Sequence, residues 1–398
     1  MLSRVLTSAD CIPLGRAVLR RNVTDAPHLP PLSVYLDAGI VPRSTRNDNH
    51  NRLGADLSKY LVVEPGDLVF NKLRTWQGGL GVSRYRGIVS PAYFVCSPTA
   101  EFESRFLHYL LRSSPYLAEF SRISKFMPPS QFDITWDDLR VVPVQRWRRG
   151  LQRAIADFLD TETARIDALI TKKRRLIELL EERMRAAVTR WISASARLPL
   201  KRLVRFQEGP GIMAADFQDE GVPLIRVAGV GSEYVTLRGC NYLDPVLVRS
   251  RWSHFALDPG DYVISASASM GIVSRVGSEA AGAIPYTGLI RFKPAAREVD
   301  MEYVRYFLRS DDFMSQIDQM KRGTAIQHFG PTHLDQVSIP YLPVPEQRAS
   351  VSAVAKVELM TRHLRELLHR QLILLQEHRQ ALITAAVTGE LDIPCVAA

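Results

Sequence analysis

The stretch Pro65-Gly66-Asp67-Leu68-Val69 returns almost unchanged as Pro259-Gly260-Asp261-Tyr262-Val263, which lies 194 positions later (259 − 65). A second match follows in the same order: LIELLEER at residues 176–183 corresponds to LILLQEHR at residues 372–379, 196 positions later (372 − 176). Solenoid repeats are much shorter, at about 20–50 residues. Two matches at nearly one offset therefore indicate the tandem duplication of a unit as large as a domain followed by a helix.

Local patterns divide the chain into four segments. Short apolar runs broken by Pro-Gly, Gly-Gly and Ser-Pro pairs predict strands and turns in residues 1–145 and again in residues 197–345. Residues 146–196 and 346–392 have apolar side chains at alternating steps of three and four, which predicts two long helices. The predicted fold class is α+β: two similar mixed α/β domains are separated by two long antiparallel coiled-coil helices and related by a pseudo-twofold axis. Such a helix pair would act as a ruler between two binding surfaces.

The apolar stripe differs between the two long helices. On the first helix it is a narrow seam that Lys173 interrupts, whereas on the second it is wider than a two-helix seam requires. We therefore expect one side of the second helix to pack on the first helix and another side to contact a partner protein. The candidates for the coiled coil or for partner docking are Ile166, Ile170, Ile177, Leu180, Met184, Met360, Leu364, Leu367, Leu368, Leu374, Leu375 and Leu382.

The composition is that of a soluble globular protein with an excess of basic side chains. Of 398 residues, 46% are hydrophobic and 23% are charged, and 51 Lys and Arg against 42 Asp and Glu give a formal charge of +9. This excess favours a polyanionic partner, although a mildly basic protein without such a partner is the alternative. Duplication gives the chain two similar binding surfaces, which suit a ligand that also has two similar halves. Duplex DNA is the commonest such ligand.

Cysteine usage and the absence of long apolar stretches indicate the compartment. Cys11, Cys96, Cys240 and Cys395 lie far apart and form no Cys-x-x-Cys pair, so we expect free thiols rather than disulfides or zinc ligands. The N-terminal residues lead into a polar stretch, and no segment approaches the roughly 20 apolar residues of a membrane span. A cytoplasmic location is the expectation.

Two junctions resemble a known family. Residues 337–348, VSIPYLPVPEQR, form a Pro-rich entry into a helix that carries Glu-Gln-Arg, and residues 374–383 with 386–389 resemble the end of that family's helix. The family is that of the specificity subunits of type I restriction–modification systems, and the likeness covers the whole chain. The first copy departs from the pattern, because residues 141–146 lack Glu-Gln-Arg and Gly150 follows early.

The resemblance implies a function and a set of partners. It implies two target-recognition domains, each reading one half of a bipartite, asymmetric site in double-stranded DNA. It implies that the long helices set the spacing and dock two methyltransferase (modification) subunits, which a restriction endonuclease/translocase subunit joins. S-adenosylmethionine, ATP and Mg would bind to those partner subunits, and this chain would hold no cofactor.

Catalytic motifs are absent from the sequence. There is no Asn-Pro-Pro-aromatic motif for a flipped adenine, no nucleotide-binding glycine motif, no Gly-x-Ser-x-Gly elbow and no His-Glu-x-x-His. His328 and His333 lie five positions apart, and a polar loop is the alternative to a metal pair there. We therefore expect a non-catalytic chain that leaves methylation and cleavage to its partners.

Loops that mix Arg, Lys, Gln, Asn and Thr with turn residues are the best candidates for DNA contact, because such side chains reach phosphates and base edges. The loops lie at residues 71–79 and 124–131 in the first domain and at residues 265–271 and 320–328 in the second. The paired loops differ, so two DNA-binding domains would read different half-sites. The candidate residues are Asn71, Lys72, Arg74, Thr75, Gln77, Lys125, Ser130, Gln131, Ser265, Ser267, Ser269, Lys321, Arg322, Thr324, Gln327 and His328.

Three alternatives remain open from the sequence. Each candidate loop could be a solvated loop without any contact. The chain could be a structural adaptor, in which a coiled coil joins two protein-binding heads; a filter-binding assay on duplex DNA separates this class from a DNA-reading subunit. A self-contained enzyme that both modifies and cuts DNA is the third class, and it would need catalytic motifs and a much longer chain.

Overall fold

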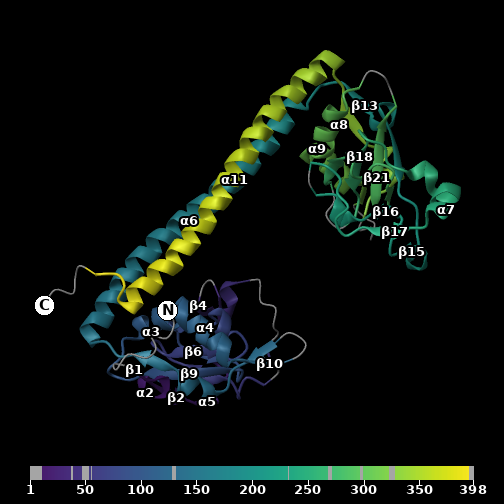
Figure 1. The fold of residues 1–398 in the computed structure, drawn as a ribbon. Coiled ribbons are helices and arrows are strands. Elements are labelled where there is room, and N and C mark those ends of the chain that lie inside the picture. Colours follow the sequence, from purple (N-terminus) through teal and green to yellow (C-terminus); the bar gives the residue numbers. More distant parts are fainter. Residues whose placement is uncertain are drawn as a thin grey trace. The chain divides into compact units, whose positions relative to one another are not determined.

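The computed structural model describes residues 11–36, 39–46, 53–54, 56–127, 131–231, 233–267, 271–295, 299–321 and 328–393. The chain divides into two compact units: unit 1 contains residues 1–174 and 369–398, and unit 2 contains residues 175–368. Each unit contains one mixed α/β domain, which we call head 1 (residues 11–145) or head 2 (residues 197–343), together with parts of two long helices (Figure 1). The two mixed α/β heads and the two long helices of the predicted fold class are confirmed.

Head 1 is built on a four-stranded antiparallel sheet with the order β2-β9-β6-β7. Leu68 and Phe70 alternate along the central strand β6, and both are completely buried against helices α3, α4 and α5. The main elements are β2 (Val18–Arg21), β6 (Leu68–Asn71), β7 (Leu80–Val82), β9 (Tyr93–Pro98), α3 (Ser104–Leu111), α4 (Ser114–Ile123) and α5 (Trp136–Arg140). Smaller strand pairs are β1 (Cys11–Pro13) with β12 (Pro143–Gln145), β3 (Leu32–Tyr35) with β4 (Gly39–Pro42), β5 (Leu61–Val63) with β8 (Gly87–Val89), and β10 (Lys125–Met127) with β11 (Gln131–Asp133).

Head 2 repeats this sheet with the order β14-β21-β18-β19 and adds a second four-stranded sheet with the order β15-β17-β16-β20. The first sheet packs on α8 through completely buried side chains such as Phe292 and Phe307. The main elements are β14 (Val204–Glu208), β18 (Tyr262–Ser265), β19 (Val273–Arg275), β21 (Leu289–Pro294), α8 (Met301–Leu308) and α9 (Asp311–Lys321). The second sheet contains β15 (Phe217–Gln218), β16 (Val222–Ile225), β17 (Asn241–Leu243) and β20 (Ile284–Pro285). The remaining pair is β13 (Arg197–Pro199) with β22 (Ser338–Pro340).

The repeated Pro-Gly-Asp sequence makes the same turn in both heads. Gly66 and Gly260 each have a φ of +93°, which side chains with a Cβ rarely adopt. The carboxylate of Asp67 accepts a hydrogen bond from the N–H of Glu64 at 2.9 Å, and that of Asp261 accepts one from Asp258 at 3.0 Å. The turn directly precedes the buried strand β6 in head 1 and β18 in head 2. The duplicated sequence therefore forms the same turn and strand in the sheet of each head.

The start of the first long helix corrects one detail of the sequence comparison. Residues 141–146 are not the counterpart of the Glu-Gln-Arg motif, because they lie in and around β12. The residue that makes the same contacts as Gln347 is Gln152, which lies inside α6 (Arg149–Trp191). The first copy therefore keeps Gln-Arg, as Gln152-Arg153, and Gly150 is part of the helix. The sequence comparison missed this match because Leu151 replaces the glutamate.

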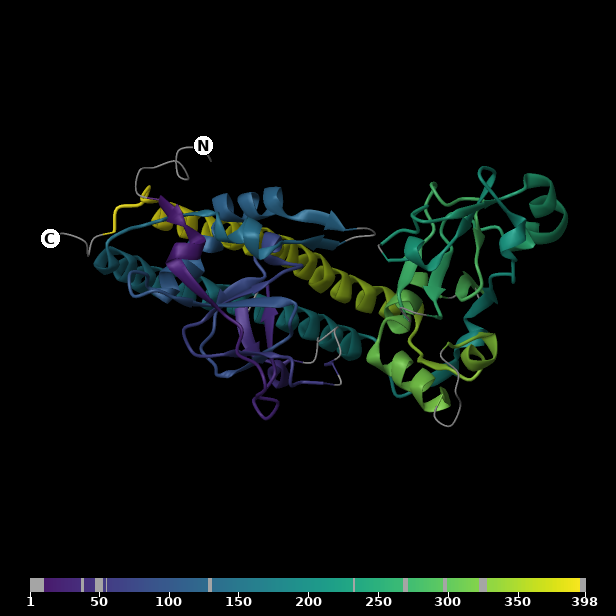
Figure 2. The same ribbon diagram turned by 90° about the horizontal axis from the view of Figure 1, so that it is seen from below.

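The long helices α6 and α11 (Val344–Thr388) lie side by side in both views (Figures 1 and 2). Residue numbers rise along one helix as they fall along the other, so the helices are antiparallel. Polar side chains bridge them at Asp167 with Arg379, Lys173 with Gln371, and Glu181 with Arg365. Among the described residues, none of the helices combines the length and the apolar character that a membrane span requires.

The predicted seam residues fall into three groups by exposure. Those buried in the helix pair are Ile166, Ile170, Leu180 and Leu368. Those partly buried are Ile177, Met184, Leu375 and Leu382. Those exposed are Met360, Leu364, Leu367 and Leu374. The second helix therefore presents apolar side chains to solvent beyond those that it buries, in line with the wide stripe in its sequence.

Candidate nucleic-acid interface

The backbone of the loop after β6 is fixed to two other segments of head 1. The N–H of Lys72 donates to the carbonyl of Ala92 at 3.1 Å, and the carbonyl of Lys72 accepts from the N–H of Ile134 at 3.2 Å. The ring of Trp76 contacts that of Phe132 in β11, with 4.7 Å between the ring centroids. The structure thus brings together the two candidate loops of the first domain, at residues 71–79 and at the β10–β11 hairpin.

Head 2 repeats this arrangement at Ala266, 194 positions after Lys72 (266 − 72). The N–H of Ala266 donates to the carbonyl of Gly288 at 2.8 Å, and the carbonyl of Ala266 accepts from the N–H of Phe329 at 3.2 Å. The segment after β18 and the segment that begins at His328 therefore lie together. The backbone geometry is conserved between the copies, but a lysine in head 1 is replaced by an alanine in head 2.

Two cations of head 1 lie over the ring of Phe94. Lys72 Nζ is 4.8 Å from the ring centroid of Phe94 and donates to the carbonyl of Pro91 at 2.9 Å. Arg20, an exposed residue of β2, has its Cζ 5.1 Å from the same ring and 5.6 Å from the ring of Trp136. Cation–π contacts hold both charges at the surface in a fixed position. Phe94 itself is buried in the head 1 core, so the contribution to the surface is a basic patch, which is typical of a nucleic-acid interface.

A second polar cluster surrounds Asn71, the last residue of β6. Because side chains alternate along a strand, Asn71 and Lys72 point to opposite faces. The amide of Asn71 donates to the hydroxyl of Tyr93 at 3.5 Å, and its side-chain oxygen accepts from the N–H of Leu73 at 3.0 Å. Burial raises the pKa of Tyr93, while the nearby positive charges of Arg74 and Arg43 act in the opposite direction. Arginine and tyrosine side chains therefore gather beside the predicted loop.

Two of the candidate residues are buried and engaged in internal hydrogen bonds. Thr75 is completely buried, and its hydroxyl donates to the carbonyl of Asn71 at 2.7 Å. Ser265 is also completely buried, and its hydroxyl donates to the carbonyl of Ser267 at 2.8 Å. In this conformation neither hydroxyl can reach a ligand in solvent. Their prediction as DNA contacts is corrected to a role in shaping the loops.

The remaining predicted DNA-contact residues differ in how exposed they are. Arg74, Gln77 and His328 are exposed, and Ser267 is half-buried. Lys125 is exposed at the start of β10, 3.7 Å from the carboxylate of Asp138. The candidates that lie outside the described residues are Ser130, Ser269, Arg322, Thr324 and Gln327, together with the side chains of Gln131 and Lys321.

Sequence reasoning missed several residues of the head 1 surface. Arg20, Arg43, Tyr93 and Trp136 come from β2, the turn after β4, β9 and α5, and they lie far apart in the chain. Their spacing has no period that a sequence pattern could reveal. The alternation of the strands was the available signal, since it places Arg20 and Phe94 on the same face of paired strands.

Metal binding has no support in the part of the chain that the structure describes. No group of three or more His, Cys, Asp and Glu side chains there is arranged to hold a metal ion. His333 is engaged within its own turn, where its Nδ1 accepts from the N–H of Gly330 at 3.2 Å.

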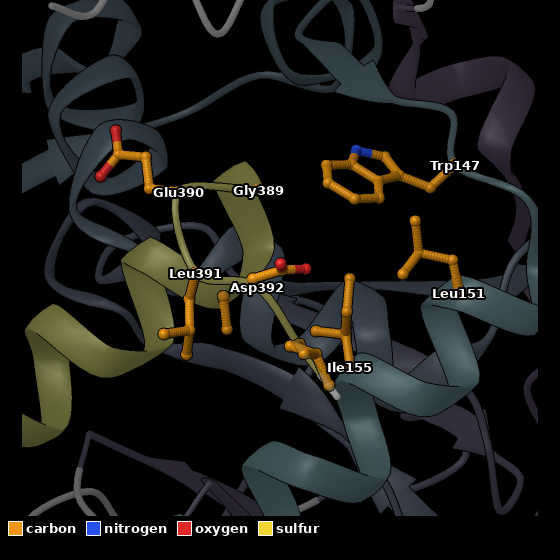
Figure 3. Close-up of a pocket in the computed structure, with 9 residues that line it drawn as sticks. Trp147, Leu151, Ile155, Gly389, Glu390, Leu391 and Asp392 are labelled. Atoms are coloured by element: carbon orange, nitrogen blue, oxygen red, sulfur yellow. The ribbon is translucent and has the colours of Figure 1, made fainter. Parts of the chain in front are cut away.

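A pocket of about 260 Å³ lies in unit 1, between the start of α6 and the residues that follow α11. Figure 3 shows Trp147, Leu151 and Ile155 on one side and the segment from Gly389 to Asp392 on the other. The Glu390 and Asp392 carboxylates at this site would repel phosphate, so the pocket is unsuited to DNA. The apolar side chains of this segment instead pack against the head 1 core, where Ile393 is buried.

Comparison with known proteins gives a structural match and no match in sequence. No family model matches the chain, and no curated protein matches it in sequence. Among solved structures, the HsdS subunit from Thermoanaerobacter tengcongensis has a TM-score of 0.51 at 18% identity, covering 96% of this chain and 97% of its own. The chain has the HsdS fold.

A second solved chain strengthens this assignment. It belongs to a structure that addresses complex assembly and conformational transition of the type I restriction–modification system. Its TM-score is 0.74 at 17% identity, and the match covers 96% of this chain and 98% of that one. The predicted resemblance to type I specificity subunits is confirmed at the level of the fold. The HsdS fold extends over both heads and both long helices.

Proposed function

We propose that this chain is the DNA sequence-specificity subunit of a type I restriction–modification complex, in which each head reads one half of a bipartite, asymmetric site. The observation that supports this most directly is the pair Lys72 and Ala266. Equivalent backbone hydrogen bonds hold both residues, yet the side chains differ. Ala266 is completely buried, so head 2 has no cation at this point of the loop. A duplicated scaffold whose loops have diverged in this way suits a site whose two halves have different sequences.

The long helices would serve two purposes in this complex. As an antiparallel pair they would hold the two heads at a set spacing along the DNA. The exposed apolar side chains of α11, among them Met360, Leu367 and Leu374, would dock two methyltransferase subunits. Apolar side chains grouped on a solvent-exposed helix face are typical of a protein interface.

Catalysis would belong to the partner subunits. We propose that the methyltransferase subunits bind S-adenosylmethionine, and that the restriction endonuclease/translocase subunit uses ATP and Mg. The specificity chain would bind no cofactor, and the assembled complex would act in the cytoplasm. Its own contribution would be to position the target base for partners that carry the chemistry.

The first test measures DNA binding by the chain together with its modification subunit. Selection from a randomised duplex library should recover one bipartite sequence with a fixed spacer. Methylation of that sequence should require both subunits. Full methyltransferase activity from a preparation that lacks the modification subunit would contradict the proposal.

A second test replaces Lys72, Arg74, Lys321 and Arg322 together with alanine. Each phosphate contact that is lost should reduce the slope of log affinity against log salt by about 1. The control replaces four exposed basic residues of the long helices, which removes the same charge: Arg183, Arg185, Lys356 and Arg370. An unchanged affinity and an unchanged slope in the loop variant would rule out these loops as the interface.

A further inference from the structure

Head 2 contains an arginine that is held between aromatic rings and that sequence reasoning did not identify. The Cζ of Arg226 lies 4.1 Å from the ring centroid of Tyr286 and 5.8 Å from that of Phe217. One guanidinium N–H donates to the side-chain oxygen of Asn241 at 3.3 Å. Three side chains from separate strands and loops thus fix the plane of this guanidinium. Head 1 has a similar device, in which Arg20 lies over two rings.

The two devices occupy different places in the duplicated fold. Arg20 pairs with Cys96 across strands β2 and β9, and the equivalent pair in head 2 is Phe206 with Phe292. A phenylalanine therefore stands in head 2 where head 1 has its arginine. The ring-bound Arg226 of head 2 lies at a separate position of the fold.

At the position of Arg226, it is head 1 that lacks the arginine. The parallel pairing of Leu224 with Ile284 in head 2 corresponds to the parallel pairing of Pro31 with Ile88 in head 1. Counting two residues onward from each pair, Arg226 and Tyr286 correspond to Ser33 and Ser90. Head 1 therefore has two serines where head 2 has an arginine on a tyrosine. Arg20 and Arg226 therefore lie at different positions of the duplicated fold.

Acidic side chains in the described part of the chain neutralise neither Arg20 nor Arg226. Within the described residues, no carboxylate lies within 4.0 Å of the guanidinium of Arg20 or of Arg226. Arg291 shows the contrasting case, since it is almost completely buried and donates to carbonyls of Ala256 and His254. A guanidinium has five N–H donors, and Arg226 uses one of them on Asn241. The remaining donors are available to a ligand.

We propose that Arg226 and Arg20 each read a guanine in a different half of the DNA site. This inference rests on the proposed function. Arginine donates two parallel hydrogen bonds to O6 and N7 of guanine, which is the commonest specific base contact. A guanidinium that aromatic rings already hold in place loses little further conformational freedom on binding. A phosphate contact would need only a charge, which exposed residues of head 2 such as Arg249 already supply.

The experiment uses the full chain in complex with its modification subunit and a randomised duplex library. The variants are Arg226→Ala, Arg226→Lys and Arg20→Ala, with Arg249→Ala as the control that removes one exposed charge from head 2. Arg226→Ala should abolish the preference for guanine at one position and lower affinity for the original site by about 5–150-fold. Arg226→Lys should relax the same position, because an ammonium lacks the two-pronged donor while it keeps the charge and the contact with the rings. Arg20→Ala should relax a position in the other half.

Each result decides the matter. The inference is wrong if the variants still select the original sequence. This holds when affinity is unchanged, and also when affinity falls equally for all duplexes, because loss of a phosphate contact would have that effect. It is also wrong if Arg20→Ala and Arg226→Ala affect the same half, or if Arg249→Ala changes the selected sequence in the same way. A wild-type complex that selects no bipartite sequence would defeat the proposed function itself, which distinguishes the two failures.

Discussion

Gln347 makes the same hydrogen bonds as Gln152, although the two residues are 195 positions apart (347 − 152). The amide oxygen of Gln152 accepts from the N–H of Glu103 at 2.9 Å, and that of Gln347 accepts from the N–H of Asp300 at 2.8 Å. Both side chains are completely buried. Each glutamine ties the first turns of a long helix to the start of the helix that covers the sheet of its head.

Replacement of Gln347 by alanine should destabilise unit 2. The variant leaves the N–H of Asp300 and the carbonyl of Leu342 without their partner, and a buried unpaired group costs about 1–3 kcal/mol. Urea denaturation of the full chain measures the loss. The control is Gln336→Ala, which removes an exposed glutamine and should change the free energy of unfolding by less than about 0.5 kcal/mol. Equal losses in the two variants would contradict a specific role for the buried amide.

Glu358 should make stability depend on pH in the acid range. Although burial raises its pKa, hydrogen bonds from Arg309 and Tyr306 and the charge of Arg305 lower it from 4.5 to about 2. Because the folded state has the lower pKa, this stabilisation of about 3 kcal/mol is complete above pH 4.5 and is lost as the pH falls toward 2.

The measurement for Glu358 compares the wild type with Glu358→Gln by urea denaturation between about pH 3 and pH 7. The advantage of the wild type should narrow steadily as the pH falls below 4.5. Glu366→Gln, which removes an exposed carboxylate from the same helix, is the control and should give a small difference at every pH. A wild-type advantage that stays constant over the range would show that the charge of Glu358 does not matter.

Replacing either of two leucines of α11 by alanine should affect a different property: one replacement should lower stability, and the other should weaken partner binding. Leu368 is 7% exposed and Leu374 is 57% exposed. Leu368→Ala should cost about 2–4 kcal/mol of unfolding free energy, because it opens a cavity between the helices. Leu374→Ala should change stability by less than about 0.5 kcal/mol and should weaken binding of the modification subunit in a titration of the purified subunits. Normal partner binding by the Leu374 variant would place the docking surface elsewhere.

Gly389 and Gly150 provide a matched pair of glycine replacements. Gly389 has a φ of +78°, and a Cβ there would lie 2.5 Å from the Trp147 ring, so Gly389→Ala should cost more than about 1 kcal/mol. Gly150 lies in α6 with no atom within 4 Å of the added Cβ, so Gly150→Ala should stabilise the chain by about 0.5–1 kcal/mol. Thermal unfolding of both variants tests the opposite signs, and a stabilising Gly389→Ala would disprove the packing against Trp147.

The candidate surface was only partly accessible to prediction. Lys72 and Arg74 could be found because they follow a buried strand in a loop rich in polar residues. Thr75 has the same local context, yet the short helical turn that follows Arg74 buries it. The aromatic support of Arg20 and Arg226 depends on residues from distant strands, which no local pattern connects.

The sequence by itself determined the duplication, the two α/β heads and the two long helices, because these features are expressed in local periodicities and in matching offsets along the chain. Only the tertiary structure decided which polar side chains face solvent, that Gln152 is the partner of Gln347 in the repeat, and that each head holds an arginine on aromatic rings. Burial and ring contacts depend on how distant strands pair, and strand pairing is a property of the folded chain as a whole.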